Sequence, residues 1–488
     1  MPTSISELIA ALPEDVETAK QPAAAGLPAL GSTASLPADV SRISFRPVPI
    51  GRFRRLTALG TLQAKIGAAY LFHWLRGWFK SADDQKRLLA ETHWRTALKL
   101  LDSMSYLRGA VMKVGQTLAN FPDIAPPEFV ETLEQLHFDA PPMHWSLLRE
   151  LVHNELGDDP ENVFARFDER AFAAASLGQV HGAQLKTGEE VAIKIQYPGI
   201  ARAVEADFRN LFLFLLPSRL GKDWESTKDQ FDDLRNRIEQ ETDYVQEATH
   251  LEKARLLFRD ADGIVVPRVF PQFSTTRILT MERVEGIHLR EFIARNPSQD
   301  ERNEVAGKIL RAWYRMYYAG RMMYVDLHPG NFLVLDDGRL GLIDFGLVMP
   351  MDAEEWEWAR RLDRPLTTGR QEDRIPAIKE WSDIRDDETD RLRVNGEFAD
   401  WCWRSRSHAG DFDFGDEPDF RRGIEIFTEL VRKRYSRARF NSTTIARCQF
   451  GMRAVLYLLK ARIDLRPIAE EEVKAAGWDR SDYAADER

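Results

Sequence analysis

Three short motifs in the middle of the chain constrain its fold more than any other feature. They are Val191-Ala-Ile-Lys194, Asp326-Leu-His-Pro-Gly-Asn331 and Asp344-Phe-Gly346. Each motif alone is weak evidence, but their order and the five-position offset between Asp326 and Asn331 are typical of a single nucleotide site. We therefore predict a fold that brings these distant segments together.

The chemistry of these side chains predicts a kinase-type site that binds ATP or ADP together with Mg²⁺. Lys194 can pair with the nucleotide phosphates, and Asp326 can position or deprotonate an acceptor hydroxyl or a water molecule. Asn331 and Asp344 offer the hard oxygen ligands that Mg²⁺ prefers. His328 lies in a tight Pro-Gly loop, so we assign it a structural role.

A lysine that binds phosphates needs an acidic partner that holds it in place. The helical segment Gln240–Ala248 contains Glu241, Asp243 and Glu247, and the last two are four positions apart on one helix face. We favour Glu247 as the partner of Lys194, with Glu241 as the rival, and place both in the catalytic set. The alternative is that this acidic segment is a solvated helix face.

The segment before the lysine takes the place of a glycine-rich phosphate loop. It carries Ala173, Ala174, Ala175 and Ser176 where glycines would let backbone amides approach the phosphates closely. A loop with these Cβ atoms is stiffer than a glycine loop. We therefore expect it to bind the nucleotide with altered preference or slower turnover.

A later strand is expected to supply the adenine edge of the site. Arg277–Gly286 resembles a strand that ends in the hinge between two lobes. Met281 would close the back of the pocket, and the backbones of Glu282 and Val284 would meet the adenine ring. A plain strand end fits the same residues equally well.

The pattern of the whole chain predicts an α+β fold with two lobes, like that of a protein kinase. We predict strands within 163–180 and at 191–196, 265–269 and 277–282. One long helical region, 201–258, separates the first two strands from the last two. They indicate a β-rich small lobe over residues 146–285 and a largely helical large lobe over 286–488. Before these lobes we expect a flexible leader, residues 1–45, and a helical extension, residues 46–145.

Composition and charge narrow the partners and the compartment. The net charge of -10 argues against nucleic-acid binding, which requires a basic face. Only two cysteines occur, without metal or disulfide spacing, so we expect a cytoplasmic protein. No apolar run reaches the roughly 18 residues of a membrane span. Ile66–Phe79, rich in aromatic and basic residues, either makes peripheral membrane contact or packs on its own domain.

The stretch after Gly346 argues against a protein substrate. It contains neither an Ala-Pro-Glu motif nor a long polar segment before the helical pattern that starts near Ala353. Protein kinases control activity through an activation loop in this place. We therefore expect poor phosphorylation of proteins in trans.

With three further elements, the chain resembles the UbiB (AarF-domain) atypical kinase-like family over about residues 95 to 350. These elements are Lys113-Val-Gly-Gln116, Ala173–His181 and Glu241-Thr-Asp243. The sequence departs from the family at Tyr324, where members often carry a histidine.

The resemblance implies that the helical extension covers the active site and restricts protein substrates. Lys113 and Gln116 would point toward the nucleotide region, where Glu241 and Asp243 would contact them. The regulatory set that the resemblance implies therefore consists of Lys113, Gln116 and Asp243.

The resemblance also implies a Mg²⁺-dependent ATPase or a small-molecule or lipid kinase. Such a protein would support isoprenoid-quinone or other lipid metabolism and would have a lipid or phenolic small molecule as partner. The alternatives are a non-catalytic nucleotide-binding scaffold that organises a biosynthetic complex, and a protein kinase. The sequence leaves the oligomeric state open.

Overall fold

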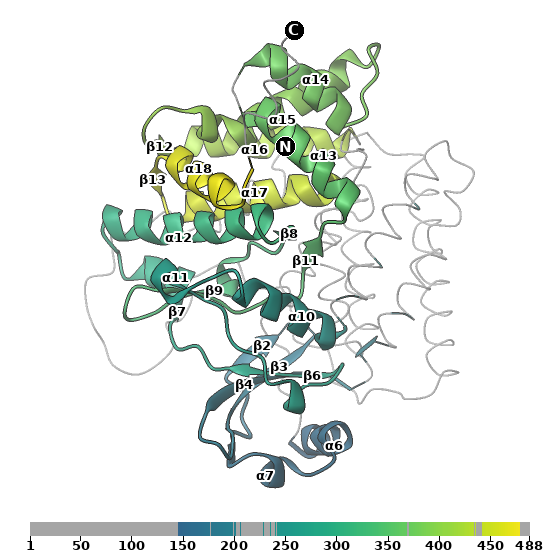
Figure 1. Cartoon of the computed structure of the whole chain (residues 1–488), viewed down its shortest axis with the longest axis vertical. Coiled ribbons are helices and arrows are strands. Elements are labelled where there is room, and N and C mark those ends of the chain that lie inside the picture. The colour runs from purple at the N-terminus through teal and green to yellow at the C-terminus, as the bar shows by residue number, and fades with distance from the viewer. Residues whose placement is uncertain are drawn as a thin grey trace, which may run out of the picture. The chain divides into compact units, whose positions relative to one another are not determined.

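The computed structural model describes most of the chain from Trp145 to Trp478. The described residues are 145–175, 177–198, 200–201, 205, 228, 235, 240, 242–367, 370–433, 435 and 442–478. The predicted leader and the predicted extension up to residue 144 lie outside them. The described part is a mixed α+β protein in which sheets are followed by a helical region, consistent with a kinase-like fold (Figure 1).

The first sheet is antiparallel, and Lys194 lies on one of its inner strands. Its strands are β1 (Arg166–Phe167), β2 (Ala173–Ala175), β3 (Gly178–Gln184), β4 (Glu190–Gln196) and β6 (Ile278–Glu282), in the order β1-β3-β4-β6 with β2 also on β3. Val191, Ile193 and Ile195 share one buried cluster with α6 (Trp145–Leu156). Because side chains alternate along a strand, Lys194 faces the opposite side of the sheet.

The three alanines before the lysine form a strand and not the loop that we predicted. Ala173–Ala175 pairs with β3, and the hairpin closes between Ala175 and Gly178. Extended backbone is compatible with a Cβ atom, so the ladder to β3 stabilises a strand here. Ala173 and Ala175 pack against the main hydrophobic core. The side chain of Ala174 and the whole of Ser176 lie outside the described residues.

We expect Gly178→Ala to destabilise this hairpin strongly. A Cβ atom at Gly178 would lie 2.1 Å from the Ile195 carbonyl oxygen, which belongs to the neighbouring strand and cannot rotate away. Overpacking of this kind costs about 2–3 kcal/mol. Chemical denaturation measures the loss. The matched control is Gly396→Ala, since a Cβ at Gly396 would meet nothing within 4 Å.

The strand predicted at residues 265–269 is wrong in extent and in sheet. β5 comprises only Ile264–Val265 and pairs in parallel with β10 (Leu340–Leu342), outside the first sheet. Val269 forms only an isolated bridge to Met281. Pro267 has no backbone N–H to donate, which interrupts the predicted run.

A second sheet and a pair of short strands lie between the first sheet and the helical region. The sheet has the order β5-β10-β9-β7, with β9 (Phe332–Val334) and β7 (Ile287–His288). The hairpin predicted between Phe332 and Ile343 is confirmed as β9 and β10. β8 (Met322–Tyr324) pairs with β11 (Val348–Pro350), so the segments on either side of the site are tied together.

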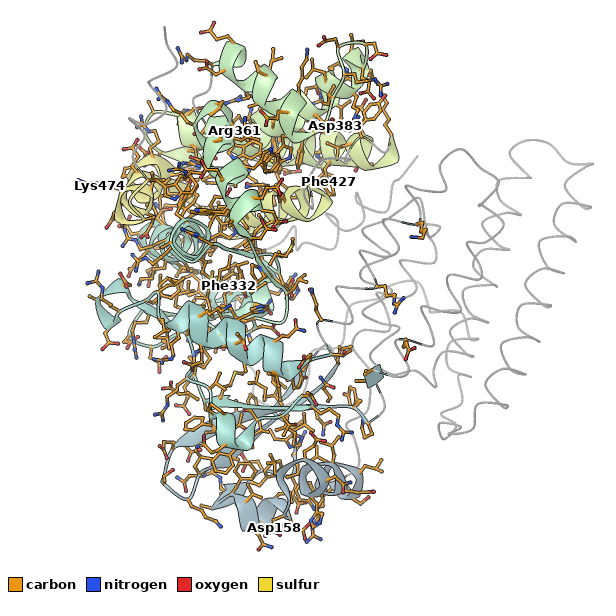
Figure 2. All side chains as sticks on the ribbon, turned by 45° about the vertical axis from the view of Figure 1, so that its right-hand side comes forward. Asp158, Phe332, Arg361, Asp383, Phe427 and Lys474 are labelled. Carbon is orange, nitrogen blue, oxygen red and sulfur yellow. The ribbon has the colours of Figure 1, made fainter. Side chains whose placement is uncertain are left out.

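The helical region follows the second sheet. Its helices are α11 (Leu289–Ala294), α12 (Gln299–Tyr318), α13 (Ala353–Thr367), α14 (Gln371–Trp381), α15 (Thr389–Ser407), α16 (Glu417–Arg432), α17 (Ser442–Leu458) and α18 (Leu465–Ala475). A capping box of Ser298 and Glu301 starts α12. Figure 2 shows Phe332 between the part that carries Asp158 and the part that carries Arg361. No described helix is long and apolar enough to cross a membrane.

Candidate functional site

The centre of the candidate site is a lysine held between two carboxylates. Lys194 Nζ lies 2.5 Å from Glu247 Oε1 and 3.1 Å from Asp344 Oδ2. Lys194 and Glu247 are each 5% exposed, so water screens their interaction little. Three segments that are far apart in sequence therefore converge on one ammonium group.

Helix α10 (Tyr244–Arg255) positions the acidic partner. The side chain of Asp243 accepts a hydrogen bond from Val245 N and thereby caps the helix, which places Glu247 in its first turn. Glu247 Oε1 also accepts from the backbone N–H of Phe345 at 3.3 Å. The same carboxylate thus links the sheet lysine to the Asp-Phe-Gly segment. The rival residue, Glu241, lies outside the described residues.

Burial and charge act against each other at this pair. Burial alone would lower the pKa of Lys194, but the carboxylates of Asp344 and Glu247 outweigh it and hold the pKa above its ordinary value. Burial also raises the pKa of Glu247, and the ammonium of Lys194 opposes that rise. The lysine is therefore fully charged at neutral pH, as phosphate binding requires.

The loop after β8 places the remaining polar groups. Asn331 ends a short 3-10 turn and donates from Nδ2 to the Asp326 carbonyl oxygen at 2.9 Å. His328 Nδ1 accepts from Gly330 N at 3.1 Å, which is the local structural contact that we assigned to this histidine. The Asp326 carboxylate is partly exposed and accepts no hydrogen bond from any described residue. It is therefore available to a substrate.

The donor set fits a hard divalent cation that is completed by phosphate oxygens. The side-chain amide N–H of Asn331 donates to the backbone carbonyl of Asp326, so its Oδ1 can act as a metal ligand. Asp344 is about one-third exposed, so its carboxylate remains accessible. Among the described residues no group of three or more His, Cys, Asp or Glu side chains could hold a metal. Mg²⁺ usually takes only one or two protein carboxylates with water and phosphates, so Asn331 and Asp344 suffice.

Tyr324 is a site residue whose role the motifs did not reveal. Its hydroxyl donates to the Asp344 carbonyl oxygen at 2.9 Å, and its side chain is fully buried against Phe345 and Phe332. The tyrosine therefore fixes the backbone of the Asp-Phe-Gly segment. Burial raises its pKa well above the ordinary value, so it stays a neutral donor.

Loss of this hydroxyl is expected to loosen the site without unfolding the protein. Tyr324→Phe keeps the buried ring but leaves the Asp344 carbonyl without its tyrosine donor, which costs about 1–2 kcal/mol. We expect the melting temperature to fall and the affinity for Mg²⁺-nucleotide to weaken by several-fold. Calorimetry measures the melting temperature and the Mg²⁺-nucleotide affinity of Tyr324→Phe. The control is Tyr457→Phe, which changes a partly exposed tyrosine of α17.

The residues that we predicted for an adenine edge lie on β6 and directly after it. Met281 is buried on β6, next to Ala192 of β4. The Glu282 N–H is already occupied, because it donates to the Arg268 carbonyl oxygen at 2.8 Å, so only other backbone atoms of Glu282 remain for a ligand. Val284 has no backbone hydrogen-bond partner among the described residues. Its amide is the better candidate for an adenine contact.

Part of the predicted set lies outside the described residues. Lys113, Gln116, Ser176 and Glu241 belong to it, so the predicted contacts of the extension stay predictions. Asp243 is described only as the cap of α10.

Comparison with known proteins identifies the domain that carries this geometry. The family model of the ABC1 atypical kinase-like domain matches residues 135–364. Residues 135–364 thus carry an ABC1 atypical kinase-like domain. The resemblance inferred from the motifs is thereby confirmed. The match contains Lys194, Glu247, Asp326 and Asp344 and begins after the Lys113–Gln116 element.

Several curated proteins are similar to this chain at moderate identity. The chain is 30% identical over 315 residues to "Atypical kinase COQ8, mitochondrial" of Saccharomyces cerevisiae, covering 62% of this chain and 60% of the yeast protein. It is 32% identical over 259 residues to "Protein ACTIVITY OF BC1 COMPLEX KINASE 8, chloroplastic" of Arabidopsis thaliana, covering 51% and 34%. The chain thus spans less than two thirds of the length of the curated relatives that it matches first.

A solved structure is also similar to this chain over most of its length. It is the complex of Rv3197 with erythromycin from Mycobacterium tuberculosis, with a TM-score of 0.52 and 25% identity. The alignment covers 80% of this chain and 98% of that chain. The likeness therefore covers more of the chain than the ABC1 domain match does.

Proposed function

We propose that this chain is a Mg²⁺-dependent ATPase or a small-molecule or lipid kinase of the ABC1 type. The observation that carries the proposal is that the carboxylates of Glu247 and Asp344 both lie at the buried ammonium of Lys194. A kinase-like domain implies nucleotide binding, and the oxygen donors of Asn331 and Asp344 support a bound Mg²⁺.

Each side chain has a defined task in the proposed reaction. Lys194 neutralises phosphate charge, and Glu247 keeps its ammonium at the sheet surface. Asp326 accepts the proton of the attacking hydroxyl or water, since its carboxylate is free of bonds to described residues. Bound Mg²⁺ would neutralise charge on the phosphates, held by Asn331 and Asp344. Transfer then gives ADP and either phosphate or a phosphorylated small molecule.

The segment after the site favours a small acceptor over a protein. β11 ends at Pro350 and α13 begins at Ala353, so only two residues separate them. A protein substrate would lack the extended docking segment that follows the Asp-Phe-Gly motif in protein kinases. We therefore propose a lipid or phenolic acceptor, a role in isoprenoid-quinone or other lipid metabolism, and action in the cytoplasm with peripheral membrane contact.

Hydrolysis assays on the full chain test this function. We expect Mg²⁺-dependent ATP hydrolysis that rises with anionic liposomes or a simple alkylphenol and falls at least about 100-fold in Asp344→Asn. The control is Asp352→Asn, an exposed aspartate beyond β11. Mg²⁺-dependent nucleotide binding without any hydrolysis would contradict the enzyme and favour a scaffold. Efficient phosphorylation of a generic protein substrate would contradict the small acceptor.

A further inference from the structure

Strand β4 carries a second buried polar side chain, Gln196, close after Lys194. The two residues are two positions apart, so their side chains lie on the same face of the sheet. Gln196 is only 1% exposed, although glutamine is mostly found at protein surfaces. A polar group that is buried this deeply needs hydrogen-bond partners, so its contacts indicate its role.

The side-chain amide of Gln196 joins two other segments of the chain. Its Nε2 donates to the Thr242 carbonyl oxygen at 2.8 Å and to the Thr276 carbonyl oxygen at 3.3 Å. The Thr276 carbonyl oxygen also accepts from the backbone N–H of Tyr244, the first residue of α10, at 3.1 Å. Both partners of the amide are carbonyl oxygens, which only accept hydrogen bonds. The place therefore requires a side chain that donates, as the amide nitrogen of glutamine does.

Strand β4 thus holds the start of α10 through two different side chains. Glu247 lies in the first turn of this helix, and its carboxylate binds the ammonium of Lys194. The amide of Gln196 binds the backbone directly before the same turn. Because Glu247 also accepts from the Phe345 N–H, a shift of this turn would disturb both the lysine and the Asp-Phe-Gly segment.

We propose that Gln196 is a positioning residue of the candidate site, which fixes α10 to β4 so that Glu247 stays at the ammonium of Lys194. This inference rests on the proposed function, since it concerns the same phosphate-binding lysine. The ion pair joins the ends of two long side chains, whereas the amide of Gln196 holds the helix backbone itself. Precise placement matters here, because a shift of about 1 Å in a catalytic group can slow a reaction about 100-fold.

Hydrogen exchange on the full chain, without nucleotide, tests this role independently of turnover. Gln196→Met keeps the length of the side chain but removes the donor to Thr242. We expect the backbone amides of residues 246–249 to exchange about tenfold faster, because the first turn of α10 then opens more readily. The matched control is Gln179→Met, at a glutamine of β3 that is 3% exposed and lies opposite Ile195, on the other face of the sheet. Unchanged exchange in Gln196→Met, or an equal rise in the control, would overturn the proposal.

Turnover shows whether Gln196 acts through Glu247. We expect Gln196→Met to lower kcat about tenfold and to change the dissociation constant of Mg²⁺-ADP less than about threefold, since the lysine is displaced and not lost. In a chain that already carries Glu247→Gln, the same substitution should lower the residual kcat little further, because residues that act as a unit are not additive. Equal factors in both backgrounds would overturn the proposal. If the unmodified chain hydrolysed no ATP, the proposed function would fail instead, and the exchange measurement would still decide the role of Gln196.

Discussion

Replacing Lys194 by methionine is expected to lower the free energy of unfolding by about 3–5 kcal/mol, as well as to abolish nucleotide hydrolysis. The lysine and Glu247 are both buried, and the variant would leave the carboxylate of Glu247 next to Asp344 without a cation. Breaking a buried pair on one side is costly because an uncompensated charge remains. Urea denaturation measures the loss.

A second substitution separates stability from activity. Lys194→Met combined with Glu247→Gln removes the orphaned charge, so we expect most of the lost stability to return while hydrolysis stays absent. Lys253→Met, at an exposed position of the same helix as Glu247, is the control and should leave both unchanged. If the double variant were as unstable as the single one, the buried charge would not be the cause.

The pH dependence of the single variant follows from the same residue. Burial already raises the pKa of Glu247 above its ordinary value, and without the ammonium of Lys194 only the hydrogen bond from the Phe345 N–H still opposes that rise. A group whose pKa is raised by folding stabilises the fold below its unfolded pKa and loses this contribution as pH rises through the folded pKa. The stability deficit of Lys194→Met should therefore shrink as pH falls from 8 toward 5. The double variant, which lacks the carboxylate, should not show this change.

The residues of the candidate site could be predicted because they lie in short sequence motifs that indicate their chemical roles. Lys194, Asp326, Asn331 and Asp344 lie in segments whose residue types and spacing already indicate phosphate and metal binding. The choice between Glu247 and Glu241 was less determined, because both are acidic residues of one helical segment. Only the position of α10 against the sheet shows that Glu247 reaches the lysine.

Features that depend on long-range packing were not predictable from local patterns. The pairing of Ile264–Val265 with β10 joins segments about 75 positions apart, and no local pattern specifies it. Tyr324 looked like a departure from a family motif, and its hydrogen bond to Asp344 emerges only when β8 pairs with β11.

The substitution Asp326→Asn is expected to lower the turnover number by about 100- to 10,000-fold while the nucleotide still binds. Asparagine has nearly the same shape but cannot accept a proton, and a positioned general base contributes an acceleration of this size. The fold should tolerate it, since the Asp326 side chain is partly exposed and the bond from Asn331 goes to its backbone carbonyl.

Steady-state hydrolysis and calorimetric nucleotide binding on the same preparation test this last prediction. Asp336→Asn, an exposed aspartate in the turn between β9 and β10, is the matched control and should behave like the unmodified chain. A fall in turnover with an unchanged dissociation constant assigns proton transfer to Asp326, because an interaction made only in the transition state lowers kcat without changing binding. If turnover were unchanged, the attacking group would not need this carboxylate. The reaction would then rest on the phosphate and metal contacts of Lys194, Asn331 and Asp344, as in enzymes where positioning and charge stabilisation supply most of the acceleration.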